Sequence, residues 1–138
     1  MNKLQQSDIP GVIEPLRKAK AKWYDGIQQT QETWHEWFQG TGRMTCSLCK
    51  YYSIQYVTSF SCNKCVLKTS KVCAKEFDVI DGLYIAVMHG EAADNAEAFE
   101  TFFTNATTMY NNICVLLDEA ERMASEILDK DLTRARGE

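Results

Sequence analysis

Proline, glycine and long apolar runs are scarce in this chain of 138 residues. Two prolines and seven glycines argue against an all-β protein, which needs many tight turns. No apolar run approaches the roughly 20 residues of a membrane span, and the first residues contain no apolar stretch typical of a secretory signal. We therefore expect one cytoplasmic domain over residues 1–138, without membrane contact. A content of 45% hydrophobic and 25% charged residues is ordinary for such a domain.

Acidic residues are missing from one part of the chain. Between Arg43 and Lys75 there are six basic residues and no acidic one. Residues 1–75 hold 11 Lys/Arg against 5 Asp/Glu, whereas residues 76–138 hold 4 against 14. This asymmetry allows two interpretations. Either the two halves pack together and neutralise each other, or the basic segment forms a surface for nucleic acid or an acidic protein.

Four of the six cysteines form two C-x-x-C pairs, Cys46/Cys49 and Cys62/Cys65, with twelve residues between them. In a reducing compartment such pairs indicate a metal site rather than disulfides. Two intervening residues let both sulfurs turn toward one point, and two such knuckles complete a tetrahedron around Zn²⁺. The sequence therefore predicts one structural zinc ion per chain. Four thiolate ligands leave no open coordination position for catalysis.

Five cysteines are candidates for four ligand positions, because Cys73 follows the second pair closely. Cys73 can replace one member of that pair, and Cys62 is the first choice. Cys114 stands apart on an apolar stripe, where we expect a buried structural thiol. Basic residues beside the ligands can offset the charge of about −2 that four thiolates leave around one zinc ion. These residues are Lys50, Lys64, Lys68 and Lys71.

Apolar spacing predicts a mainly α fold: long antiparallel helices with an inserted zinc-knuckle or zinc-ribbon segment. Helices are expected over 12–40, 77–90 and 95–130, with the zinc-binding segment over 43–75. Alternation over 51–61 predicts a short β-hairpin in that segment, and residues 83–88 fit a strand as well as a helix. The long helix spans about 50 Å, which exceeds a compact domain of this size. The helix predicted over 12–40 carries Trp23, Trp34 and Trp37, which form either part of the core or a stacking platform.

The cysteine framework resembles that of small phage and prophage zinc proteins. In that group C-x-L-C is followed by C-x-x-C-P-[IV], a T-G turn, a further Cys and an amphipathic helix. The corresponding stretch here is about 44–87, with Val66 in place of the Pro and Ser70 in place of the Gly. The resemblance implies a phage accessory protein, located in the host cytoplasm, that binds and modulates a host protein such as a defence factor.

Enzyme motifs were not found in the sequence. There is no Gly-rich phosphate loop, H-E-x-x-H helix or G-x-S-x-G elbow. Glu32-x-x-His35 has the form of a di-iron ligand pair, but such a site needs a second one. We therefore expect a non-enzyme.

Two function classes remain. The first is a zinc-stabilised interaction module, in which a host protein or a second copy of the chain covers apolar surface near Met123, Ile127 and Leu128. The alternative is a zinc-ribbon nucleic-acid-binding protein, in which cations and stacking aromatics contact a single strand. Its contact residues would be Lys50, Lys64, Lys68, Lys71, Tyr51 and Tyr52.

Overall fold

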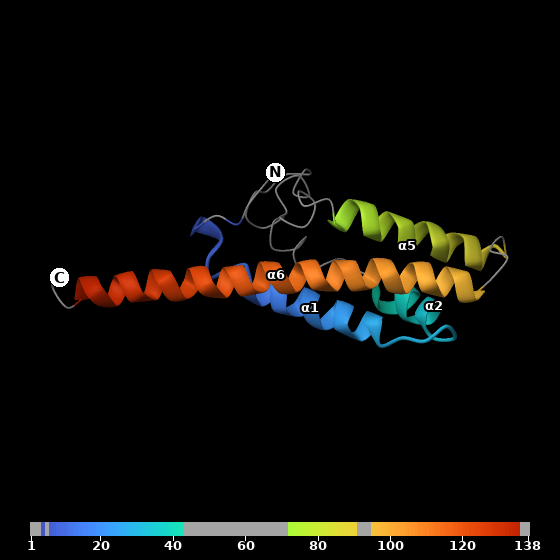
Figure 1. The fold of residues 1–138 in the computed structure, drawn as a ribbon, viewed down its shortest axis with the longest axis horizontal. Helices are drawn as coiled ribbons and strands as arrows, with labels where there is room; N and C mark the ends of the chain where they lie inside the picture. Colours follow the sequence, from blue (N-terminus) through green and yellow to red (C-terminus); the bar gives the residue numbers. More distant parts are fainter. Residues whose placement is uncertain (1–3, 5, 43–71, 91–94, 136–138) are drawn as a thin grey trace.

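The computed structural model describes residues 4, 6–42, 72–90 and 95–135, with side chains for all of these except 72–78, 95 and 133–135. Within these ranges the chain forms helices and turns (Figure 1). The expectation of a mainly helical fold is confirmed for this part of the chain. A short 3-10 helix, η1 (Gln6–Asp8), precedes the first α-helix, and Leu4 beside it is buried in the core.

The predicted fold class is wrong in its β component. No strand occurs in the part of the chain that the structure describes. Residues 51–61, to which the hairpin was assigned, lie outside that part. Residues 83–88, which also fitted a strand, belong to helix α5 (Val72–Met88). Helix prevails there because Ile80 and Tyr84, four residues apart, are both buried on one side of α5.

Helix α6 (Asn95–Ala135) is the central element of the fold. Its 41 residues correspond to a length of about 60 Å. The helix contains neither proline nor glycine, so no backbone position favours a break. One side of it is buried at helical spacing over six turns, and this side forms most of the core. The buried residues of α6 are Ala98, Phe102, Ala106, Met109, Ile113, Leu117 and Ala120.

A polar row runs along a different side of α6. Thr101, Asn105, Thr108 and Asn112 each donate a side-chain hydrogen bond to the carbonyl four residues earlier, at 2.8–3.2 Å. Threonine and asparagine are weak helix formers because their side chains compete for backbone groups. In α6 these side chains bond to carbonyl groups of the same helix, so the polar row is compatible with a continuous α6.

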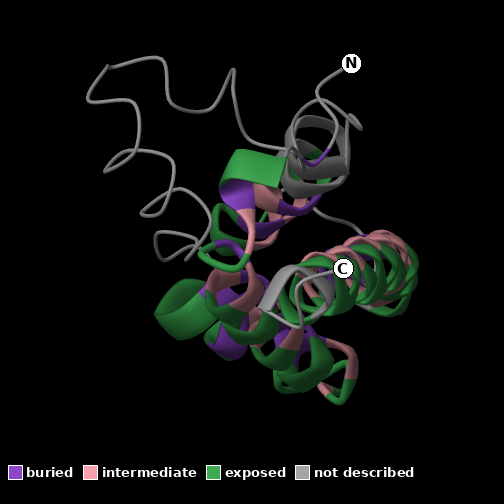
Figure 2. Cartoon of the chain, turned by 90° about the vertical axis from the view of Figure 1, so that its left-hand side faces the viewer, coloured by how far each residue is buried: buried purple, intermediate pink, exposed green. Residues whose placement is uncertain are grey.

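Helices α1 (Ile13–Ile27) and α5 flank α6 on opposite sides (Figure 1). Helix α1 is antiparallel to α6, since Arg17 pairs with Glu121 while Tyr24, further along α1, contacts Tyr110. Helix α5 ends at Met88, and Gly90 then adopts a left-handed φ of 70° that lets the chain turn back into α6. In Figure 2, which looks along the molecule, buried residues lie between the helices and exposed residues on their outer turns.

The predicted single helix over 12–40 is wrong. Helix α1 ends at Ile27, and after a turn the chain forms α2 (Trp34–Trp37) and the π-helical turn η2 (Phe38–Gly42). In one continuous helix Trp23 and Trp37 would lie about 21 Å apart along the axis. Their ring centroids are instead 5.5 Å apart, because the break folds α2 back onto α1. Burial of both indoles favours the broken chain over a longer helix.

Candidate functional site

Most of the predicted zinc site lies outside the described residues. Cys46, Cys49, Cys62 and Cys65 are among these, as are the neighbouring lysines and tyrosines predicted to contact nucleic acid. Cys73 is the second residue of α5, although its side chain is not described. Elsewhere in the described chain, no three His, Cys, Asp or Glu residues are placed to hold a metal ion.

Described helical elements adjoin the predicted zinc segment at both of its ends. On one side the described chain stops at Gly42, which is buried beneath the rings of Trp37 and Phe38. On the other side it resumes at Val72, the first residue of α5. Phe38 and Tyr84 connect the two flanks, since their ring centroids are 5.5 Å apart. The residues on either side of the segment therefore belong to one packed helical body.

The three tryptophans belong to the core and do not form a stacking platform on the surface. All three are buried. Trp34 stacks on Phe102 of α6 with ring centroids 4.9 Å apart, and Trp37 meets Trp23 edge to face. The indole Nε1 of Trp37 donates a hydrogen bond to Asp25. These large side chains thus pack α1, α2 and α6 against one another.

The contact of His35 with α5 was not predicted from the sequence. Its ring stacks on Tyr84 of α5, with centroids 4.5 Å apart and planes inclined by 23°. Its Nε2 atom is buried and has no hydrogen-bond partner among the described residues. Glu32 lies in the turn before α2, so Glu32 and His35 do not share a helix. His35 therefore contributes to the contact between α2 and α5.

Cys114 is half-buried on α6, whereas the apolar stripe predicted a buried structural thiol. It lies one turn after Tyr110 on α6. Hydrogen bonding to Cys114, which favours the neutral phenol, and then burial raise the pKa of Tyr110 above its usual value of 10.0. Tyr24 of α1 packs against the Tyr110 ring at 5.9 Å.

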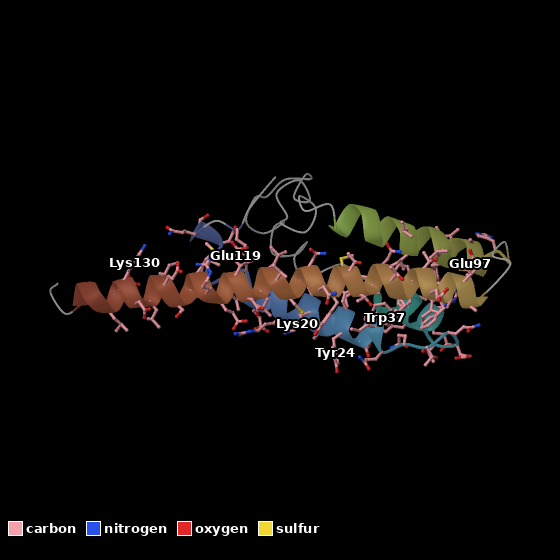
Figure 3. The ribbon with its side chains drawn as sticks, in the orientation of Figure 1. Lys20, Tyr24, Trp37, Glu97, Glu119 and Lys130 are labelled. Atoms are coloured by element: carbon pink, nitrogen blue, oxygen red, sulfur yellow. The ribbon has the colours of Figure 1, made fainter. Side chains whose placement is uncertain are left out.

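The C-terminal end of α6 extends beyond the helices that cover the rest of it (Figure 1). Ala120 is its last buried residue, and Met123 is the last that packs against the core. Beyond it, Ile127 is half-buried and 59% of Leu128 is exposed. Figure 3 places Lys130 on this free part, whereas Lys20 and Tyr24 lie where α1 covers α6. The apolar surface expected near Met123, Ile127 and Leu128 is thus present at the last two.

Comparison with known proteins returned no relative: no family model, curated protein or solved structure matches the chain. Within the described part, no helix has the length and apolar character needed to cross a membrane.

Proposed function

We propose that this chain is a non-enzymatic, zinc-stabilised interaction protein. In this proposal a helical body carries a structural zinc segment, and the free end of α6 binds another protein. The resemblance to phage zinc proteins favours a host protein as the target, bound and modulated in the host cytoplasm. The observation that carries the proposal is the exposure of Leu128, 59%, on a helix end that no described element covers.

The donor set supports zinc as the cofactor. Two C-x-x-C pairs with Cys73 nearby supply soft thiolate ligands in the number and spacing that zinc requires. Neighbouring lysines would offset the negative charge of the site. Because α1, α2, α5 and α6 have a core of their own, zinc would order the inserted segment rather than the whole protein.

The shape and chemistry of the α6 end support a protein as the partner. Ile127 and Leu128 lie next to each other, and Leu132, one turn after Leu128, is exposed as well, among charged residues at this end of the helix. Amphipathic helices of this kind bind by placing their apolar side into a groove of the target. Helix α6 carries eight acidic and three basic residues, so the groove of the target is expected to have a basic rim.

The alternative is nucleic-acid binding through the basic segment. Six basic residues without an acidic one between Arg43 and Lys75 favour it. A series of binding measurements at increasing salt separates the two functions. Contacts to phosphates release counterions, so nucleic-acid affinity falls steeply with salt. A protein contact centred on Leu128 depends much less on salt.

The test uses the double variant Ile127→Asp/Leu128→Asp. Proteins captured from host lysate by the wild-type chain are identified and purified, and their affinities for both chains are measured. Two carboxylates placed in a dry contact cost several kcal/mol, so binding should be lost. Val115→Asp is the matched control, because Val115 is exposed on the same helix but lies before its free end. Equal loss of binding in the control, or full binding by the double variant, would refute the proposed contact.

A further inference from the structure

The side of α6 that α1 covers continues beyond the start of α1. Tyr110 marks this side, because Tyr24 of α1 packs against its ring at 5.9 Å. Leu128 comes eighteen residues after Tyr110, which is five full turns, and therefore faces the same direction. Leu132 follows one turn later and lies about 40° from the same line. Leu128 and Leu132 thus form an apolar strip that extends the α1-binding side of α6.

No element in the described part of the chain covers this Leu128/Leu132 strip. Helix α1 begins at Ile13, and η1, which precedes it, lies at the opposite edge of α6 in Figure 1. The exposed fraction is 59% for Leu128 and 47% for Leu132. A second helix placed end to end with α1 along α6 would bury both side chains.

Acidic residues surround the strip. Glu121 lies two turns before Leu128 on the same side of α6, and Asp131 lies about 60° from Leu128 around the helix. The two basic residues of this end do not offset these charges. Arg122 is engaged in an ion pair within α6, and Lys130 points to the side of α6 away from α1 (Figure 3). The chemistry of the strip is therefore an apolar centre with a negative border.

Helix α1 is an example of a helix that packs on this side of α6. It carries four basic residues against two acidic ones. Leu16, Ala19 and Trp23 are buried at helical spacing. At the edge of this contact Arg17 pairs with Glu121 of α6 at 3.6 Å. The α1-binding side of α6 thus accepts a basic amphipathic helix, whose apolar residues give the affinity and whose cations favour this partner over an acidic one.

We propose that the Leu128/Leu132 strip binds a basic amphipathic helix of the target protein, aligned with α1 and antiparallel to α6. This inference rests on the proposed function and specifies which element of the target makes the contact. Apolar residues of that helix would cover the strip, and its Lys or Arg residues would face Asp131 and Glu121. Nucleic acid suits this surface poorly, because its phosphates would meet carboxylates. Pairing of this end with itself in a second copy would oppose like charges in the same way.

Binding of designed peptides to the full chain tests the proposal. Each peptide has about 18 residues, or five helical turns, with leucines at helical spacing. One peptide carries lysines beside the leucines and the other carries glutamates at the same positions. Fluorescence anisotropy of the labelled peptides gives their dissociation constants. The lysine peptide should bind in the micromolar range, since the strip is short, and the glutamate peptide at least about tenfold more weakly.

Variants of the chain locate the binding surface. Leu128→Asp and Leu132→Asp should each raise the dissociation constant of the lysine peptide by about tenfold or more, since each places a charge in an apolar contact. Asp131→Lys should raise it by a similar factor through repulsion. Glu119→Lys is the matched control, because it makes the same change of charge at an exposed position on the opposite side of α6 (Figure 3). Both leucines are exposed, so their variants should keep the melting temperature of the wild type.

Equal binding of the lysine and glutamate peptides overturns the inference. So does equal weakening by Asp131→Lys and Glu119→Lys, which indicates only a diffuse attraction of cations to α6. The same variants are then measured with the purified target protein. A target that Leu128→Asp releases while Asp131→Lys leaves it bound excludes the basic helix but keeps the proposed function. A target that still binds Ile127→Asp/Leu128→Asp refutes the proposed function itself, whichever peptide binds.

Discussion

Trp37 of α2 and Asp25 of α1 are joined by a hydrogen bond, with 2.8 Å between the indole Nε1 and the carboxylate Oδ2. The same indole ring rests on Gly26, where an added Cβ would lie 2.6 Å from its Cη2 atom. The bond and the close approach together hold α2 against the end of α1. This arrangement is what ends the long predicted helix, because Trp37 can reach Asp25 only if the chain reverses.

The hydrogen bond should contribute measurably to stability. Trp37→Phe removes the donor and Asp25→Ala removes the acceptor, and each should lower the free energy of unfolding by about 1–3 kcal/mol, as expected for a bond to a charged group. Denaturant unfolding measures both changes. In the double variant the losses should not add, because each single change already removes the bond. Additive losses would mean that the bond contributes nothing.

Gly42 should tolerate no side chain. A Cβ atom there would lie 2.5 Å from Cδ1 of Phe38 and 2.9 Å from Cζ3 of Trp37, and both rings are buried. We expect Gly42→Ala to cost about 1–3 kcal/mol of stability through overpacking. Gly40→Ala, two residues earlier, is the matched control, since its Cβ meets nothing within 4 Å. That variant should be neutral or slightly more stable. Equal melting temperatures for the two variants would contradict this account.

Purified protein should contain one zinc ion per chain, as determined by elemental analysis. Cys46→Ser or Cys49→Ser should lose the metal, since removing one thiolate leaves an incomplete tetrahedron. Chelation should leave most of the helical circular dichroism unchanged, because the helices share a core that holds without the segment. Cys114→Ser is the control and should keep its zinc, since Cys114 lies on α6 and not in the predicted zinc segment. Zinc well below one equivalent in untreated protein would refute the site.

The ionisation of Tyr110 should depend on Cys114. The hydrogen bond to the sulfur, then burial, raise the pKa of Tyr110 above 10.0. A raised pKa means that the folded state holds this proton more tightly than the unfolded state. Stability from this group is therefore complete below pH 10 and is lost as the pH rises through the folded-state pKa. Cys114→Ala should lower the pKa of Tyr110, measured by NMR of ¹³Cζ-labelled tyrosine with Tyr110→Phe as the assignment control. An unchanged pKa would exclude the hydrogen bond as its cause.

The sequence by itself determined the helical class, the long α6 and the separation of charge between the two halves. These properties are local: the 3.6-residue spacing of apolar residues and the lack of proline and glycine in 95–135 act along a single helix. The two C-x-x-C pairs are also a local signal, and the zinc prediction that they carry lies outside the described residues.

Only the tertiary structure decided where the first helix breaks and which surfaces remain open. The break after Ile27 depends on Trp37 packing against Trp23 and Gly26, contacts between residues that are not neighbours in one helix. The half-buried state of Cys114 is likewise a tertiary property, since the apolar stripe of α6 does not say which of its sides α1 covers. The exposure of Leu128 follows from relative helix lengths: α1 and α5, with 15 and 17 residues, cannot cover the 41 residues of α6. Spacing along a chain predicts which residues share a side of a helix, but burial of that side depends on what packs against it.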